Sequence, residues 1–175
     1  LEVSPAWVHA LQAIRTEWPH SMEHPRTDNF GIALYSRLEI ESLQELTLSP
    51  KAVPTLRAVL GNGTAVVLTH PLPPIGGAYA ADRDEQLGRL AGLLNTDVPT
   101  VVMGDLNCTP WSACFPSRGP VAGGTSPATL PGIMRLPIDH VLTGGGATIR
   151  TLELGPAIHS DHVPIIADIA LPTTP

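Results

Sequence analysis

The sequence is short of the residues and runs that mark several classes of protein. Only two of its 175 residues are cysteine, Cys108 and Cys114, and both lie in one short segment without CxxC spacing. That pattern argues against a zinc site and against a framework of disulfides. No apolar run approaches the ~20 residues of a membrane span, and no signal peptide is present. We therefore expect the two cysteines to be small, half-buried apolar residues.

Basic residues are also few. The chain has 10 Lys and Arg against 16 Asp and Glu, a net charge of −6 and a pI near 5.5. Proteins that follow a nucleic-acid backbone usually carry a basic surface, so this balance argues against tight, non-specific binding to DNA or RNA. The charge balance does not exclude a nuclease that binds its substrate through a metal ion. Aromatic residues make up 4% of the chain, so the core must be built from Val, Ile, Leu and Ala.

What is present suits one folded domain, residues 1–175. The chain is 43% hydrophobic with a mean hydropathy of +0.14, which is enough apolar material for a core. The 19 prolines and 16 glycines predict many turns and loops. The sequence begins at Leu1 rather than at Met, and we expect it to be part of a longer protein. The absence of a targeting segment therefore says nothing about the parent protein.

Hydrophobic periodicity predicts strands covered by a few helices. Ser4 and Pro5 have the character of a helix start, and apolar residues follow at helical spacing as far as Trp18. A second helix is predicted at 82–95, with four leucines on one stripe. Continuously apolar runs at 65–69 and 99–103 predict strands covered on both faces. Further strands are expected at 31–36, within 38–48, and at 138–142, 148–154 and 163–171, with loops at 70–78 and 116–131. The pattern predicts a sandwich of sheets with helices outside.

Polar residues recur just past the ends of these buried strands. They belong to the ligand and acid–base types of a hydrolase that uses a hard cation: His70, Asp105, Asn107, Asp139, His140, Asp161 and His162. Taken singly, each has an ordinary explanation as a turn residue, a backbone cap or a loop histidine. Four such places in one small domain favour a shared active centre, because strand ends are where rigid scaffolds present catalytic groups.

The motifs around these residues resemble those of the endonuclease/exonuclease/phosphatase family. The matching segments, in family order and running nearly end to end, are DNFGIALYSR (28–37), THPLPP (69–74), GDLNCTPWS (104–112), PIDHVL (137–142) and SDHVP (160–164). The opening LEVSPAW falls where the family carries a metal-binding glutamate, at Glu2. The resemblance implies an α+β fold of the DNase I-like type. In that fold two mixed sheets, flanked by helices, form a four-layered α/β/β/α sandwich, with the site at one rim.

The resemblance also implies a role for each residue in hydrolysis of a phosphate ester. Glu2 and Asp161 are expected to hold the metal, Mg²⁺ or alternatively Mn²⁺. Asp105 would position or deprotonate the nucleophile, and Asn107 would hold a phosphate oxygen. His162 would contact the scissile phosphate or activate the attacking water, with Asp139 orienting its ring. His70 would stabilise developing negative charge or assist the leaving oxygen. Such chemistry needs positioning and charge neutralisation more than a protein nucleophile.

The chain departs from the family pattern at three places. The family begins with an upstream strand whose Asn helps the metal site, so we expect this chain to be incomplete at its N-terminus and a poor catalyst by itself. Between Phe115 and Thr125 the family carries a longer helix and loop where this sequence has a short Pro/Gly stretch, and the sequence leaves open whether that is a true deletion; Val163 stands where Arg is common in the family. The resemblance is nearest to bacterial domains, some attached to membrane segments. Whether this domain lies outside the cytoplasm of a membrane-attached parent stays open.

Four functions compete at this point. The first is a metal-dependent phosphodiesterase or phosphatase, favoured because a domain that had lost catalysis has no reason to keep the full polar set. The second is a non-catalytic binding or sensory domain of the same fold. The third is a nuclease, which the acidic balance disfavours. The fourth is an unrelated α/β binding protein with chance motifs. No basic or aromatic cluster in the loops 70–84 and 116–136 names a substrate.

Overall fold

The computed structural model describes residues 1–51, 53–116 and 120–173. Nine strands, two α-helices and two 3₁₀ turns are present in these residues. In chain order they are α1 (Pro5–Leu11), η1 (Gln12–Ile14), β1 (His20–His24), β2 (Ile32–Ser36), β3 (Ile40–Leu46), β4 (Thr55–Leu60), β5 (Ala65–Thr69), α2 (Gly77–Leu94), β6 (Thr100–Asp105), η2 (Gly132–Met134), β7 (Asp139–Gly144), β8 (Thr148–Leu154) and β9 (Ile165–Ala170). The bounds agree most closely with expectation at β2, β5 and β8.

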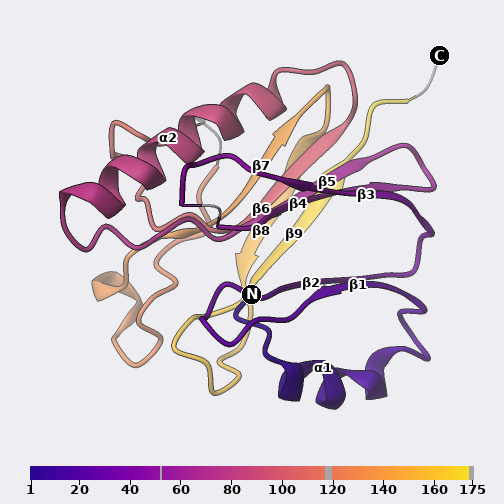
Figure 1. Ribbon diagram of the computed structural model, residues 1–175, viewed down its shortest axis with the longest axis horizontal. Helices are drawn as coiled ribbons and strands as arrows, with labels where there is room; N and C mark the ends of the chain where they lie inside the picture. Colours follow the sequence, from indigo (N-terminus) through magenta and orange to yellow (C-terminus); the bar gives the residue numbers. More distant parts are fainter. Residues whose placement is uncertain (52, 117–119, 174–175) are drawn as a thin grey trace.

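A five-stranded sheet forms the centre of the molecule (Figure 1), in the order β3-β4-β5-β6-β7. Strands β5 and β6 run parallel, because the chain crosses over through α2 between them, and the other neighbours are antiparallel. Every residue of β5 is buried, as its continuous apolar run predicts. The parallel pair brings the carboxyl ends of β5 and β6 to the same edge, and the site is built there.

Helix α2 covers one face of this sheet. Leu87 and Leu90 are completely buried, and Leu93 and Leu94 pack against the same cluster, so the predicted leucine stripe faces the core. Gln86 of α2 is also fully buried and donates hydrogen bonds from Nε2 to the hydroxyls of Thr55 and Thr69. The helix begins at Gly77, five residues before the expected start at 82, so part of the expected loop 70–78 is helical.

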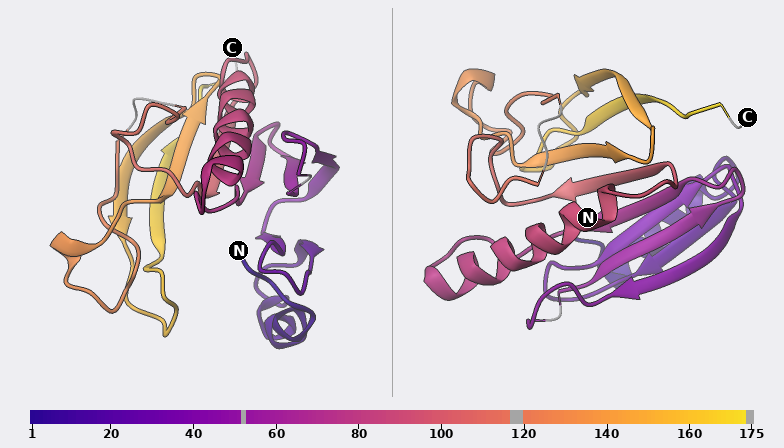
Figure 2. Two further views of the ribbon diagram at one scale, coloured as in Figure 1. Left: turned by 60° about the vertical axis from the view of Figure 1, so that its left-hand side comes forward. Right: turned by 90° about the horizontal axis from the view of Figure 1, so that it is seen from above.

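The β1–β2 hairpin covers the opposite face. Met22 and Ile32 pack against Leu56, Val66 and Leu68 of the central sheet. Helix α1 lies outside the hairpin, so α2, the sheet, the hairpin and α1 form four successive layers (Figure 1). The β8–β9 hairpin lies beside β7, on the far side of the molecule from β3, in both views of Figure 2.

The sheets differ in detail from the two mixed sheets that the resemblance implies. The central sheet is mixed, whereas β1–β2 and β8–β9 are two separate antiparallel pairs. Among the described residues, no strand joins β2 to β9. The second sheet layer is therefore two hairpins with a hollow between them, and that hollow opens at the site.

Several elements depart from the sequence-based prediction. The first helix ends at Leu11 and continues only as a 3₁₀ turn, not to Trp18. It buries no residue, and Trp7 is 60% exposed, so little packing supports a longer helix. Strand β1 was not predicted because Met22 is its only buried residue. Strand β4 was also missed, although an Asn62-Gly63 turn joins it to β5 in a recognisable hairpin. Residues 117–119 of the expected loop 116–131 lie outside the described residues.

Candidate active site

Two carboxylates face each other across the sheet edge. Asp105 is the last residue of β6 and Asp139 the first of β7, and the antiparallel register pairs them directly. Asp105 is 6% exposed, while Asp139 is half-buried. Two carboxylates placed side by side and shielded from water are costly unless neighbouring groups compensate their charge. The compensation here comes from histidines on two other segments.

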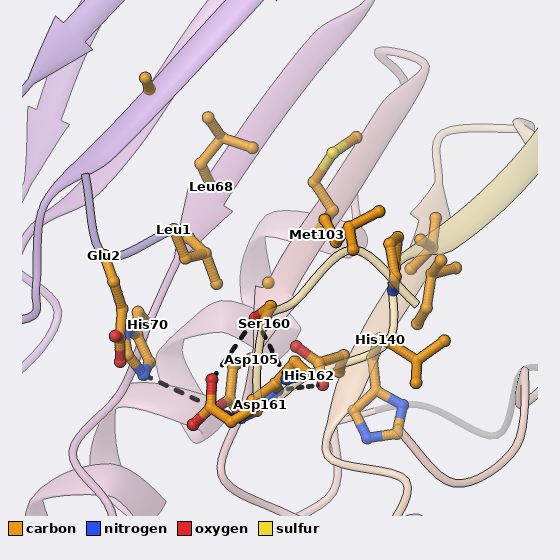
Figure 3. Close-up of a pocket in the computed structure, with 18 residues that line it drawn as sticks. Leu1, Glu2, Leu68, His70, Met103, Asp105, His140, Ser160, Asp161 and His162 are labelled. Atoms are coloured by element: carbon orange, nitrogen blue, oxygen red, sulfur yellow. Dashed lines mark hydrogen bonds and ion pairs between the residues drawn. The ribbon is translucent and has the colours of Figure 1, made fainter. Parts of the chain in front are cut away.

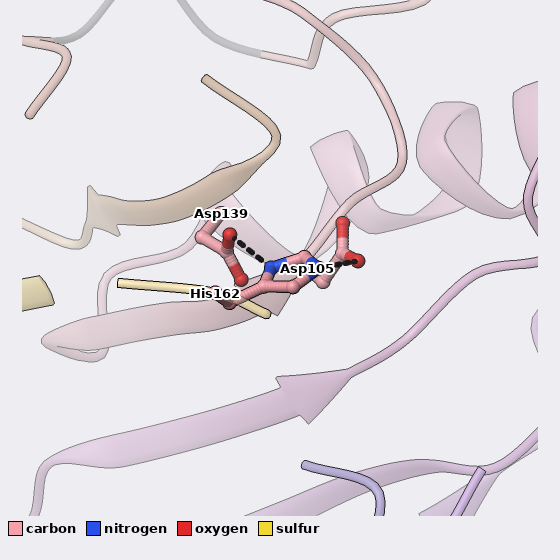
Figure 4. A group of neighbouring side chains, drawn as sticks. All are labelled: Asp105, Asp139 and His162. Carbon is pink, nitrogen blue, oxygen red and sulfur yellow. Dashed lines mark hydrogen bonds and ion pairs between the residues drawn. The ribbon is translucent and has the colours of Figure 1, made fainter. Parts of the chain in front are cut away.

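His162 lies between these two carboxylates (Figure 4). Its Nδ1 is 2.6 Å from Asp139 Oδ2, and its Nε2 is 3.9 Å from Asp105 Oδ2. The hydrogen bond to Asp139 is the main cause that raises the pKa of His162 to about 9, although partial burial acts in the opposite direction. The ring is therefore a cation at neutral pH, and Asp139 fixes the orientation in which Nε2 faces Asp105.

His70 approaches Asp105 from the other side. It follows the last residue of β5, and the parallel pairing of β5 with β6 brings its Nε2 to 3.6 Å from Asp105 Oδ2. The ring is 6% exposed and lies against Phe30, with ring centroids 5.2 Å apart. Its Nδ1 is buried and has no hydrogen-bond partner among the described residues. Asp105 is thus flanked by two imidazoles from separate segments.

Asn107 is held in a tight turn after β6. Its backbone N–H donates to Asp105 Oδ1 at 2.8 Å, and its side-chain Nδ2 donates to the Pro71 carbonyl at 2.9 Å. The residue has a φ of 47°, in the left-handed region that asparagine tolerates better than most side chains. The side chain therefore links the loop after β6 to the loop after β5.

Glu2 and Asp161 line the same cleft but come from opposite ends of the chain (Figure 3). Next to Glu2, Val3 is fixed by two backbone hydrogen bonds, from its own N–H to the Gly31 carbonyl and from the Arg26 N–H to its carbonyl. The Asp161 carboxylate accepts a long hydrogen bond of 3.4 Å from the Ser160 hydroxyl. Both carboxylates line the cleft, and neither makes a salt bridge with a side chain in the described part of the chain.

The cleft has a polar rim and an apolar floor. Its volume is about 410 Å³, and the floor is formed by Leu68, Met103 and Val141 of the central sheet, between Ala33 of β2 and Ile165 of β9. A second hollow of about 480 Å³ shares Glu2, His70, Asp105 and His162 with it and also reaches Asn107. The two hollows share residues, and between them they are bordered by every residue to which the sequence assigns a catalytic or metal-binding role: Glu2, His70, Asp105, Asn107, Asp139, Asp161 and His162.

The donor set suits a hard divalent cation. Asp105, Asp139 and His162 offer ligand atoms that all lie within 4.8 Å of one another. However, the short bond between Asp139 and His162 already engages one carboxylate oxygen and one ring nitrogen. Glu2 and Asp161 present carboxylate oxygens without a strong partner, and oxygen ligands are what Mg²⁺ prefers. Glu2 and Asp161 are therefore candidate ligands beside the group of Asp105, Asp139 and His162.

Other residues that position the site carry no motif in the sequence. Arg83 of α2 donates from Nη1 to the Asn107 carbonyl at 2.7 Å and so helps to hold the turn after β6 in place. Thr125 is fully buried, and its hydroxyl accepts long hydrogen bonds of 3.4 Å from the N–H groups of Ile138 and Asp139. Arg83 looks like any charged helical residue, and Thr125 lies in a stretch read as loop. His140, which neighbours Asp139, points away from the site and bonds the Cys108 carbonyl.

Comparisons with known proteins identify a family and a fold. The profile of the endonuclease/exonuclease/phosphatase family matches residues 1–162. No curated protein matches the chain. Solved structures that resemble it include a family protein from Beutenbergia cavernae (18% identity, TM-score 0.70, covering 94% of this chain and 57% of that one). They also include a humanized D. rerio TDP2 (14%, 0.72, 97% and 83%) and sphingomyelinase C from Streptomyces griseocarneus (16%, 0.58, 95% and 80%). At these identities the likeness establishes the fold, which is the α+β, DNase I-like fold expected from the sequence.

Proposed function

We infer that this chain, which belongs to the endonuclease/exonuclease/phosphatase family, hydrolyses phosphate esters by attack of water with the help of a divalent cation. One observation carries the proposal. The Asp105 carboxylate lies between the rings of His70 and His162, and Asp139 holds the second ring in place. That arrangement offers one group to accept a proton and two to meet negative charge, which is what hydrolysis of a phosphate ester requires.

The charge state of His162 favours one of its two candidate roles. Because its pKa is raised to about 9, the ring carries its proton at neutral pH and cannot take another from water. It is suited to contact a phosphate oxygen through Nε2–H. Asp105 is then the acceptor for the proton of the attacking water. His70 lies on the opposite side of Asp105, where it can meet the charge that develops on the leaving oxygen.

Asn107 and the metal ligands complete the proposed site. The amide of Asn107 borders the second hollow and is suited to hold a phosphate oxygen. Glu2 and Asp161 would hold Mg²⁺, or Mn²⁺ as the alternative, and a bound cation would supply positive charge against the phosphate.

The net charge of −6 favours small phosphate esters over a long nucleic-acid polyanion. Among the described residues, no helix is long and apolar enough to cross a membrane.

The test is a panel of phosphate monoesters and diesters, with release of product measured in Mg²⁺, in Mn²⁺ and in a chelator. We expect at least one ester to be hydrolysed, the reaction to stop with chelator, and Asp105→Asn to reduce turnover by about 10²–10⁴-fold. Asp168→Asn, an exposed carboxylate on β9, is the matched control and should keep full turnover. Chelator-resistant hydrolysis would reject the mechanism. Binding of esters without any hydrolysis would favour a non-catalytic domain instead.

A further inference from the structure

The two cysteines of the chain meet directly behind the Asn107 turn. Their Sγ atoms are 2.7 Å apart, and both are free thiols in this structure. A disulfide bond is about 2.05 Å long, so the two sulfur atoms are within a small movement of bonding distance. The contact joins residues six positions apart, within the segment that follows β6.

Local structure holds the two thiols together. After Cys108 the chain reverses in a turn closed by a hydrogen bond of 3.0 Å from the Ser112 N–H to the Thr109 carbonyl. The hydroxyls of Thr109 and Ser112 are also bonded, at 2.8 Å, and the Phe115 N–H donates to the Ser112 carbonyl. This turn returns Cys114 to Cys108, and both pack into the core cluster beneath α2. The approach is therefore built into the fold of the segment.

The same segment carries the Asn107 turn of the proposed active site. Cys108 directly follows Asn107, and its carbonyl accepts a hydrogen bond of 2.9 Å involving His140 Nε2. In the absence of a disulfide bond, the turn that carries Asn107 is held by hydrogen bonds to Asp105, Pro71 and Arg83. A link between the two sulfur atoms would close a short loop immediately behind it and limit its motion.

We propose that Cys108 and Cys114 form an intramolecular disulfide that fixes the turn carrying Asn107. The bond forms by exchange with an external disulfide, R–S–S–R. One cysteine thiolate attacks it and releases one R–SH, and the other thiolate then displaces the second R–SH from the mixed disulfide. Two protein thiols lose two protons and two electrons, and the external disulfide gains them as two thiols. The inference does not depend on the proposed function.

Burial of the two thiols determines at which stage thiol–disulfide exchange can occur. Cys108 is 2% exposed, and burial raises the pKa of the Cys114 thiol to about 12. Since the thiolate is the attacking form, the folded dithiol exchanges slowly, and the bond forms readily while the segment is still open during folding. Such bonds persist in oxidising compartments. In an oxidising compartment the bond, once formed, would therefore be retained.

The experiment is to refold the chain in mixtures of reduced and oxidised glutathione, alkylate it after denaturation, and measure its mass. We expect a monomer in which neither cysteine is alkylated and which is lighter than the dithiol by the two thiol hydrogens. Two alkylated cysteines after refolding in excess oxidised glutathione would overturn the proposal. So would a product in which the cysteines carry glutathione or link separate chains.

Single-cysteine variants supply the matched controls. Cys108→Ser and Cys114→Ser each retain one thiol, which should be alkylated or carry glutathione under the same conditions. Reducing the wild-type disulfide should speed amide hydrogen exchange of residues 107–114 by roughly 10-fold or more, while exchange in β5 stays unchanged. The double variant Cys108→Ala/Cys114→Ala should exchange at the same rate with and without reductant. Equal exchange in the oxidised and reduced wild type would show that the bond does not fix the turn.

Discussion

At the scale of single residues, the charge of His162 depends chiefly on one contact, the hydrogen bond to Asp139. The folded-state pKa of about 9 lies above the ordinary value of ~6.5, so this contact stabilises the folded protein when the ring is protonated. The contribution is fully present below pH ~6.5 and is lost as the pH rises through about 9. The Asp139 carboxylate therefore determines the protonation state of the His162 ring. It also determines the pH above which their contact no longer stabilises the folded protein.

Replacing that carboxylate should release the proton. In Asp139→Asn we expect the pKa of His162 to fall from about 9 toward the ordinary ~6.5, because a neutral amide no longer favours the imidazolium. The measurement is an NMR titration of the ring protons in metal-free protein. Asp161→Asn is the control, since that carboxylate makes the smallest contribution to the shift and should leave the pKa nearly unchanged. Equal shifts in both variants would mean that the hydrogen bond is not the cause.

Arg83 allows a test of whether a side chain of α2 positions the Asn107 turn of the site. Arg83→Ala removes the donor to the Asn107 carbonyl, and we expect turnover to fall by roughly 10- to 100-fold through misplacement of the turn. Arg89→Ala, six residues further along α2, removes an exposed side chain that pairs with Glu85 and should keep turnover within about twofold. Rates and unfolding curves for both variants separate misplacement from loss of stability. Unchanged turnover in Arg83→Ala would exclude the positioning role.

The residues that line the candidate site could be predicted from the sequence, whereas the residues that hold them in position could not. His70, Asp105 and His162 belong to short motifs at strand ends, where local sequence indicates both residue type and location. Arg83 and Thr125 act through a backbone carbonyl and through backbone N–H groups of distant segments. Such contacts exist only after the chain has folded, and no local pattern in the sequence marks them.

At the scale of elements, the junction of β5 and β6 depends on a missing side chain. A Cβ atom at Gly104 would lie 1.9 Å from the Thr69 carbonyl oxygen, which is backbone and cannot turn aside. We therefore expect Gly104→Ala to lower the free energy of unfolding by about 3 kcal/mol or more, because the two strands must separate. Denaturant unfolding measures the effect.

Gly88 provides the opposite case in α2. A Cβ there meets nothing within 4 Å, and alanine has the higher helix propensity. Gly88→Ala should raise the free energy of unfolding by about 0.5–1 kcal/mol in the same experiment. If Gly104→Ala proved as harmless as Gly88→Ala, the close packing of the β5 and β6 ends would be disproved.

The fold could be predicted where burial is strong and continuous. Strand β5 and the leucine stripe of α2 are apolar enough to identify from the sequence, and the structure buries both. Strand β1 contributes one buried side chain and is held by pairing with β2, so its own residues carry little signal. The length of α1 was overestimated because helical spacing of apolar residues does not ensure that they are buried.

At the scale of the whole molecule, the proposed metal ligands lie at residues 2 and 161, near opposite ends of the chain. A cation that binds only the folded protein stabilises it, by about 2.7 kcal/mol at 100 times its Kd. We expect Mg²⁺ or Mn²⁺ at that level to raise the Tm by roughly 5–10 °C, given ~2–4 °C per kcal/mol for a chain of this size. Thermal unfolding with and without the ion measures this.

Two variants separate metal binding from the rest of the site. Glu2→Gln should remove most of the metal-dependent rise in Tm, whereas Asn107→Ala should retain it. Asp139→Asn discriminates the alternative ligand group of Asp105, Asp139 and His162. If Asp139→Asn abolished the rise and Glu2→Gln did not, the cation would bind that tight group instead.

The spread of the site along the chain also has a consequence for synthesis on the ribosome. His162 lines a cleft in which Glu2, His70, Asp105 and Asp139 are all made before it. Translation at ~5–20 residues per second leaves several seconds between Asp105 and His162. For the first part of that interval the nascent chain also lacks β7 and its Asp139, and until residue 162 is added it lacks the histidine that lies between Asp105 and Asp139. A nascent chain that ends before the SDHVP motif therefore lacks the histidine that contacts both carboxylates, and the arrangement on which the proposed chemistry rests cannot form.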